Sequence, residues 1–174
     1  MARSGVRAMA KFKNYHLDKY IDFEDNYGPI IEDSPEFGQI LLDNKDCLEM
    51  FTRELEAKFK EKTVRKHLSN VEVYLNDFLA LRLGEGPGEG CDVDNLNSFF
   101  SWMPSHLMYS DESTVKDTIA GLKRFFKLML DKGVIEKAEY QEFLEMVKDN
   151  KEYWLEEMAQ FNNVDDDSDF FFDY

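Results

Sequence analysis

The stretch that decides the fold is residues 63–82, whose sequence is TVRKHLSNVEVYLNDFLALR. Apolar side chains recur in it at steps of three and four residues, the spacing of one face of an α-helix. A threonine opens the stretch and a glycine follows it, so we expect a helix with Thr63 as N-cap and Gly84 as stop. The apolar stripe consists of Val64, Leu68, Val71, Leu75 and Phe78, with Leu81 close to it.

A second stretch, residues 113–133, repeats this design, with Ser113 as the expected N-cap and Gly133 as the expected terminator. Each of the two helices has one apolar face that must be covered, so we expect them to pack against each other in the core.

Further helices surround this pair. Ser34 and Pro35 begin one that extends over 35–60 and is expected to break near Asp43 and Asn44. Asp92 or Asp94 caps a short helix that Pro104 should stop. A last helix with a strongly acidic outer face should cover about 136–161, and Tyr27, Gly28 and Pro29 should form a turn.

No segment of convincing length alternates in the manner of a strand, so the sequence predicts an all-α fold, a compact helical bundle of four to six helices. We expect an N-terminal extension over 1–33, the bundle over 34–161, and an acidic-aromatic disordered tail over 162–174.

Charge is distributed unevenly along the 174 residues, whose net charge is −15. Residues 1–59 carry 8 basic and 12 acidic side chains, residues 60–133 carry 10 and 11, and residues 134–174 carry 3 and 13. The net charge of the whole molecule repels nucleic acid, but the net charge of residues 60–133 is close to zero.

The two cysteines do not form a Cys-x-x-Cys motif, which argues against a disulfide scaffold or a zinc knuckle and fits the cytoplasm. No apolar run is long enough to span a membrane.

One family resemblance rests on the order of these pieces. Residues 62–68 are KTVRKHL, residues 74–79 are YLNDFL, residues 113–127 are STVKDTIAGLKRFFK, and residues 131–135 are DKGVI. Over about 60–133 the chain resembles the N-terminal core-binding domain of tyrosine recombinases and phage integrases. The resemblance implies a SAM-like bundle that clamps one face of duplex DNA and contacts phosphates through these two helices.

The chemistry of that family belongs to a separate catalytic domain with an arginine, a His-x-x-Arg pair and a tyrosine nucleophile. None of the three histidines, His16, His67 and His106, has an arginine three residues later, and about a dozen residues follow the last expected helix. Tyr174 has no cationic pocket around it in the sequence to activate it. We therefore expect no enzyme activity, no cofactor and no metal site.

The first functional hypothesis is a non-catalytic DNA-associating protein. Its candidate phosphate-binding residues are Lys62, Arg65, Lys66, Lys116, Lys123, Arg124 and Lys127. The alternative is an acidic protein-interaction or regulatory module that binds no DNA and docks a basic protein through its C-terminal region. A contiguous basic face would favour the first, and ion pairs between these cations and residues 136–157 would favour the second.

Three other features have plain structural interpretations. His67 lies at the edge of the apolar stripe, so we expect a packed histidine rather than a ligand. Aromatic residues that could stack on bases are expected in the core instead: Phe99, Phe100, Trp102, Phe125 and Phe126. The tail 162–174 is either a solubilising end or a competitor that lies on the protein's own basic face.

Overall fold

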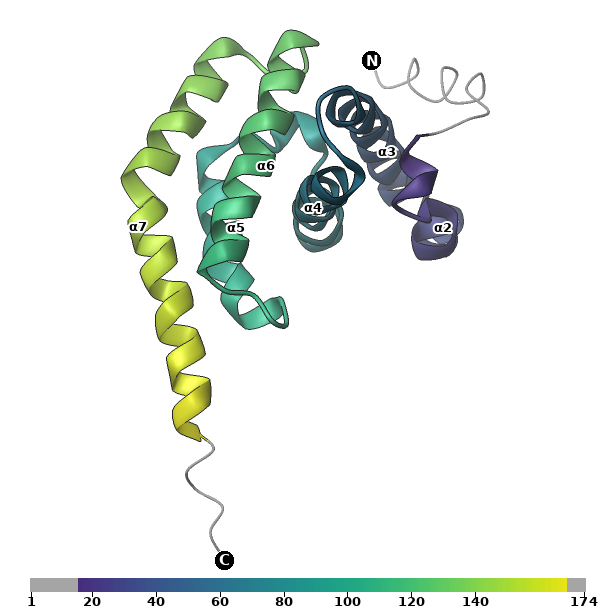
Figure 1. Cartoon of the computed structure of the whole chain (residues 1–174). Coiled ribbons are helices and arrows are strands. Elements are labelled where there is room, and N and C mark those ends of the chain that lie inside the picture. The colour runs from purple at the N-terminus through teal and green to yellow at the C-terminus, as the bar shows by residue number, and fades with distance from the viewer. Residues whose placement is uncertain (1–15, 169–174) are drawn as a thin grey trace, which may run out of the picture.

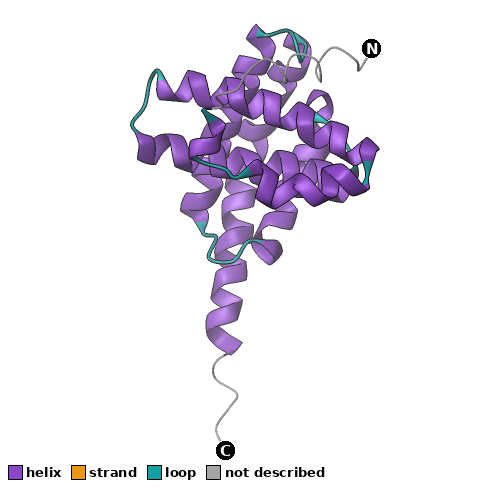
Figure 2. Cartoon of the chain, turned by 90° about the vertical axis from the view of Figure 1, so that its right-hand side faces the viewer, coloured by secondary structure: helices purple, strands orange, loops and turns teal. Residues whose placement is uncertain are grey.

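Helix is the only regular structure in the part of the chain that the computed structural model describes, residues 16–168, and no strand occurs there (Figure 2). The prediction of an all-α fold with four to six helices is confirmed, because six α-helices form in this part. In chain order the elements are the 3-10 turn η1 (Leu17–Lys19), α2 (Phe23–Asp33), α3 (Pro35–Glu56), α4 (Glu61–Glu72), the π-helix η2 (Val73–Leu83), the 3-10 turn η3 (Pro87–Glu89), α5 (Val93–His106), α6 (Glu112–Asp131) and α7 (Lys137–Ser168).

In Figure 1 the helices extend from α2 at the right to α7 at the left, with α5 and α6 overlapping between α4 and α7. Helix α2 packs on α3, α3 on α4, α4 on α6, and α7 covers both α5 and α6. The α4–α6 contact is the most extensive of all. It confirms that the helices predicted at 63–82 and 113–133 pack together.

The predicted apolar stripe of α4 and η2 forms the centre of the core. Val64, Val71 and Leu75 are fully buried, and Leu68 and Phe78 are 1% exposed. Leu81, expected close to this stripe, is 42% exposed. The i→i+5 hydrogen bonds of a π-helix put more residues into each turn than an α-helix has. Side chains near the end of η2 therefore face other directions than the α-helical spacing predicts.

Both predicted glycine stops are confirmed. Gly84 has a φ of 69°, and the amides of Gly84 and Glu85 donate to the Ala80 and Leu79 carbonyls. Gly133 has a φ of 72° and ends α6 in the same way. A left-handed residue is needed to close each helix with this pair of bonds, and glycine adopts it without steric cost.

The two predicted N-caps are wrong. Lys60 is the N-cap of α4, and the Thr63 amide already donates to the Lys60 carbonyl within the first turn. Asp111, not Ser113, caps α6, where its carboxylate accepts the Thr114 amide at 2.9 Å. Asp92, one of the two residues expected to cap the short helix, does cap α5, where it accepts the Asp94 and Asn95 amides.

Three predicted breaks do not occur. Helix α3 is continuous through Asn44, a fully buried residue whose side-chain amide donates to the Leu75 carbonyl and the Asn76 side chain. Pro104 lies inside the last turn of α5, which ends at His106. The expected turn at residues 27–29 lies within α2, where Tyr27 is 7% exposed and its hydroxyl donates to Glu72 of α4. In these places contacts between helices outweigh the local breaking signals.

The ends of the bundle differ from the predicted boundaries. Residues 16–33, assigned to an extension, pack into the bundle: Leu17 is fully buried, and the Glu49 carboxylate accepts the His16 and Leu17 amides at 2.8 and 2.7 Å. Helix α7 continues to Ser168, so 162–168 are helical rather than disordered. Residues 1–15 and 169–174 of the expected end segments lie outside the described residues.

Candidate anion-binding face

All seven candidate cations are exposed. Lys62, Arg65 and Lys66 belong to α4, and Lys116, Lys123, Arg124 and Lys127 belong to α6. Because α4 and α6 pack directly on each other, their charged rows are neighbours. The Lys66 ammonium of α4 lies 3.2 Å from the Asp117 carboxylate of α6.

Gly121 allows the two helices to approach closely. A Cβ at this position would lie 3.3 Å from Nδ1 of His67 and 3.5 Å from Cγ2 of Val71. His67 fills the crossing point and is 6% exposed, with its ring 6.0 Å from that of Phe59. The packed histidine predicted from the sequence is therefore confirmed.

His67 adds no positive charge to this face at neutral pH. Burial lowers the pKa of its imidazole, and the neighbouring Arg124 and Lys66 lower it further, against a smaller opposite effect of Asp117. A second proton on the ring would be unfavourable beside these two cations. The charge of the face comes from its lysines and arginines.

Arg65 and Lys66 of α4 are held in local ion pairs. The Arg65 guanidinium lies 2.8 Å from Glu61 and covers the Tyr20 ring at 5.1 Å. Glu61 is also 3.3 Å from Lys19 of η1, and the hydrogen bond from Arg65 is the largest cause that lowers the pKa of this carboxyl. Arg65 and Lys66 are therefore already paired with carboxylates of the same face, Glu61 and Asp117.

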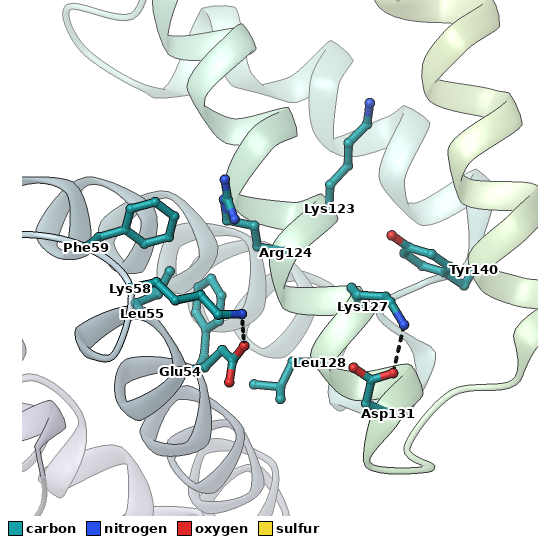
Figure 3. A pocket seen from close by; sticks show the side chains of 11 residues that line it. Glu54, Leu55, Lys58, Phe59, Lys123, Arg124, Lys127, Leu128, Asp131 and Tyr140 are labelled. Carbon is teal, nitrogen blue, oxygen red and sulfur yellow. Dashed lines mark hydrogen bonds and ion pairs between the residues drawn. The ribbon is translucent and has the colours of Figure 1, made fainter.

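Three cations of the C-terminal half of α6 line a pocket of about 400 Å³ between α3, α6 and the start of α7 (Figure 3). Lys123, Arg124 and Lys127 line it from α6, and Lys58 lines it from the segment after α3. Lys116 stands seven residues before Lys123, about 10 Å away along the helix axis. The structure therefore brings three of the seven candidates together and leaves Lys116 and the α4 cations outside the pocket.

The pocket has an apolar lining beneath these charges. Phe51, Leu55, Phe59 and Leu128 contribute to it, and Tyr140 of α7 lies at its edge. Phe51 is fully buried, Leu55 is 1% exposed and Leu128 is 8% exposed. Phe59 and Tyr140 are only partly buried, so their rings are the apolar surface that a ligand can contact. A ligand that combines negative charge with apolar groups matches these rings and the pocket cations.

The pocket cations differ in how they are paired. Lys58 pairs with Glu54, and Lys127 lies 2.8 Å from Asp131, a hydrogen bond that raises the pKa of the Lys127 ammonium (Figure 3). The Arg124 guanidinium covers the Phe59 ring at 4.5 Å, which leaves the edge that carries its N–H groups available. Lys123 makes no ion pair or hydrogen bond within the described chain.

None of the seven candidate cations pairs with residues 136–157, as far as the described side chains show. Their partners are carboxylates of α4 and α6 themselves. The arrangement that would have favoured the alternative hypothesis, a basic face neutralised by the last helix, does not form.

The six pocket residues outside α6, among them Glu54, Lys58, Phe59 and Tyr140, were not among the predicted site residues. They come from parts of the chain that the fold brings to α6, so no spacing within one helix marks them. The adjacent Lys58 and Phe59, just after an apolar helix, were the one available signal.

The aromatic residues assigned to the core lie there. Phe99, Phe125 and Phe126 are fully buried and Phe100 is 2% exposed. Trp102 is partly buried and stacks on Phe99 with ring centroids 5.9 Å apart. None of these rings forms an exposed platform on which bases could stack.

The requirements of a metal site, a reactive cysteine and a membrane-spanning helix are not met by residues 16–168. It contains no group of three or more His, Cys, Asp or Glu side chains that could hold a metal ion. Cys47 and Cys91 are buried, and burial raises the pKa of each thiol to about 12, which keeps both in the unreactive protonated form. No helix among residues 16–168 has the length and apolar character to cross a membrane.

Comparison of the chain with family models, curated proteins and solved structures finds no match. The resemblance to the recombinase core-binding domain therefore stays a prediction from the sequence.

Proposed function

We propose that this chain is a non-catalytic DNA-associating protein whose α4–α6 face contacts the phosphate backbone. In this proposal the helical bundle is of the SAM-like recombinase core-binding type. The observation that carries the proposal is that Lys123 and Arg124, consecutive in α6, both line the pocket and have no carboxylate partner among the described residues.

Unpaired cations are the ones that bind phosphate most readily. A lysine that is already paired with a carboxylate must break that ion pair before it binds a phosphate. Lys123 and Arg124 can bind a phosphate without breaking an ion pair. The guanidinium of Arg124 can also donate two parallel hydrogen bonds to one phosphate. Lys127, Lys58 and Lys66 would add weaker contacts because each has a carboxylate within reach.

The net charge of −15 sets the expected strength of binding. Salt screens charges over a length of about 10 Å at 0.1 M. Repulsion between DNA and the acidic C-terminal region acts over longer distances and is screened, whereas direct contacts to phosphate are shorter than this length. We therefore expect weak duplex binding that depends on a local face.

Fluorescence anisotropy of a labelled duplex at low salt tests the proposal. The double variant Lys123→Glu, Arg124→Glu should abolish binding, because it turns the unpaired cations into anions. Its matched control is Arg82→Glu, Lys148→Glu, which makes the same change of charge at exposed positions of η2 and α7. This control should lose little affinity. Equal losses in both variants would show that only bulk charge matters.

The salt dependence gives a second readout. Each phosphate contact contributes about −0.9 to the slope of log K against log salt, so Lys123→Ala, Arg124→Ala should make the slope shallower by about 1.8. An unchanged slope would place the phosphate contacts elsewhere. No binding by the intact chain at low salt would refute the proposal.

A second candidate function is an acidic protein-interaction module without DNA binding. An exposed apolar patch beside the acidic helix α7 favours it: Met108 is 81% exposed, Tyr109 is 94% exposed with a φ of 61°, and Phe161 of α7 is 38% exposed. These residues line a pocket of about 430 Å³ between the α5–α6 loop and α7. A partner with both basic and apolar side chains would fit this surface. Failure of the duplex to bind would leave it as the better candidate.

A further inference from the structure

The pocket on α6 has two properties that a ligand must match. Lys123 and Arg124 offer positive charge without a carboxylate partner in the described chain, and the partly buried rings of Phe59 and Tyr140, which pack against the buried core, form an apolar floor. A bare phosphate would satisfy the cations and leave the floor unused. An acidic peptide with aromatic side chains would satisfy both.

One segment of this chain has that composition. Residues 165–174, DDDSDFFFDY, contain five aspartates, four aromatic rings and no cation. Their charge is opposite to that of the pocket, whose lining includes four cations and two carboxylates. The charges and the apolar surfaces of the two are therefore complementary.

The segment cannot reach the pocket of its own molecule. Tyr140 lies at the pocket, and α7 continues for 28 more residues to Ser168, about 42 Å at 1.5 Å per residue. The six residues after Ser168 span at most about 20 Å when extended. Figures 1 and 2 show the last turns of α7 extending beyond the other helices.

The direction of α7 is fixed by contacts near its far end. The Asn162 side chain donates to the Ser110 carbonyl at 3.1 Å, and the Ser110 hydroxyl lies 3.5 Å from the Met158 sulfur. These contacts hold α7 at the start of α6, whereas the pocket is on the C-terminal half of α6. The expectation that the tail lies on the basic face of its own molecule is therefore inconsistent with this geometry for the pocket cations Lys123, Arg124 and Lys127.

We propose that the α6 pocket binds the acidic-aromatic segment 165–174 of a second copy of this chain. Aspartates of the segment pair with Lys123 and Arg124, and its aromatic rings cover the apolar floor. Every copy carries one pocket and one segment, so two copies can exchange segments in a closed dimer or continue into an open chain. Duplex DNA and the segment then compete for the same two cations.

Sedimentation of the full chain over a concentration series, without DNA, tests this proposal. The average mass should rise with protein concentration at low salt and rise less at high salt, because the pairing is partly ionic. A mass equal to that of the monomer at every concentration would overturn the proposal. Tail docking within one molecule, through unwinding of α7, would give that result.

Two variants locate the contact. Lys123→Glu, Arg124→Glu removes the pocket charge, and replacement of Phe170, Phe171, Phe172 and Tyr174 by Ser removes the rings but keeps all five aspartates. Each should remain monomeric alone. The control Arg82→Glu, Lys148→Glu should associate as the intact chain does. Circular dichroism should show the same melting for all of them, since every described position that is changed is exposed.

A mixture of the two defective variants is the decisive measurement. One retains its segment and the other retains its pocket, so a heterodimer should form although neither variant associates alone. A mixture that stays monomeric would overturn the pairing of pocket and segment, even if the intact chain self-associates through another surface. The serine variant keeps the whole α4–α6 face, so its duplex binding reports on the proposed DNA function separately.

Discussion

Single residues in η2 differ sharply in their contribution to the core. Leu75 is fully buried, whereas Leu81, six residues later in the same π-helix, is 42% exposed. Burial, rather than residue type or position in a helix, should decide the cost of removing each side chain.

We expect Leu75→Ala to lower the free energy of unfolding by about 2–5 kcal/mol, because it leaves a cavity among fully packed neighbours. Leu81→Ala is the matched control and should cost less than about 1 kcal/mol. Urea unfolding followed by circular dichroism measures both. Similar losses in the two variants would contradict the burial that the structure assigns to Leu75.

Asp46 of α3 gives a pH-dependent prediction. Burial, and then the Asp43 carboxylate, raise the pKa of Asp46 from its usual 3.8 to about 6, with Lys45 acting in the opposite direction. The folded state thus binds the proton more tightly than the unfolded state does. The Asp46 contribution to stability therefore falls as pH rises from about 4 to about 6.

Asp46→Asn should for that reason stabilise the protein at pH 8 by about 1 kcal/mol, a value reduced for solvent screening of a half-buried group, and should change little at pH 4. Thermal unfolding of both proteins at the two pH values measures the difference. A gain of equal size at both pH values would mean that the carboxylate charge is not its cause.

At the scale of elements, two helical glycines have opposite surroundings. A Cβ on Gly38 of α3 would lie 2.8 Å from the Ile31 carbonyl oxygen of α2, whereas a Cβ on Gly28 of α2 would meet nothing within 4 Å apart from its own helix backbone and its chain neighbours. Alanine is the better helix former at both positions by about 1 kcal/mol. Only at Gly38 does the close approach of two helices oppose that gain.

Gly28→Ala should change the free energy of unfolding by less than about 1 kcal/mol, because the following Pro29 opposes the gain in helix propensity, whereas Gly38→Ala should lower it by about 1–3 kcal/mol through overpacking against backbone. Chemical denaturation of the two variants provides the comparison. Stabilisation by Gly38→Ala would show that α2 is not held against α3 as the structure describes.

The helices themselves could be predicted from apolar spacing, but their ends and breaks could not. The stripe from Val64 to Phe78 is as expected, because burial of one helix face leaves a period in the sequence. A helix break was predicted near Asn44, but this residue lies within α3, and its buried side chain donates hydrogen bonds to residues of η2. Its partners lie more than thirty residues away, and no local pattern shows them.

At the scale of the whole molecule, the charge is divided between two regions. Acidic side chains dominate α7 and the residues after it, while Lys123 and Arg124, which pair with no carboxylate of the described chain, stand on α6. The sequence was enough to name Lys123, Arg124 and Lys127 as candidates. It could not show that Lys58, Phe59 and Tyr140 join them, because the pocket exists only after α3, α6 and α7 have packed.

The central claim is that anionic ligands, duplex DNA above all, bind at the C-terminal half of α6. Amide chemical shifts of the isotope-labelled full chain, recorded during titration with a short duplex at low salt, test it most directly. We expect the largest shifts in residues 58–66 and 116–127, around Lys123 and Arg124. Shifts confined to α7 and the α5–α6 loop, or no shifts at all, would contradict it.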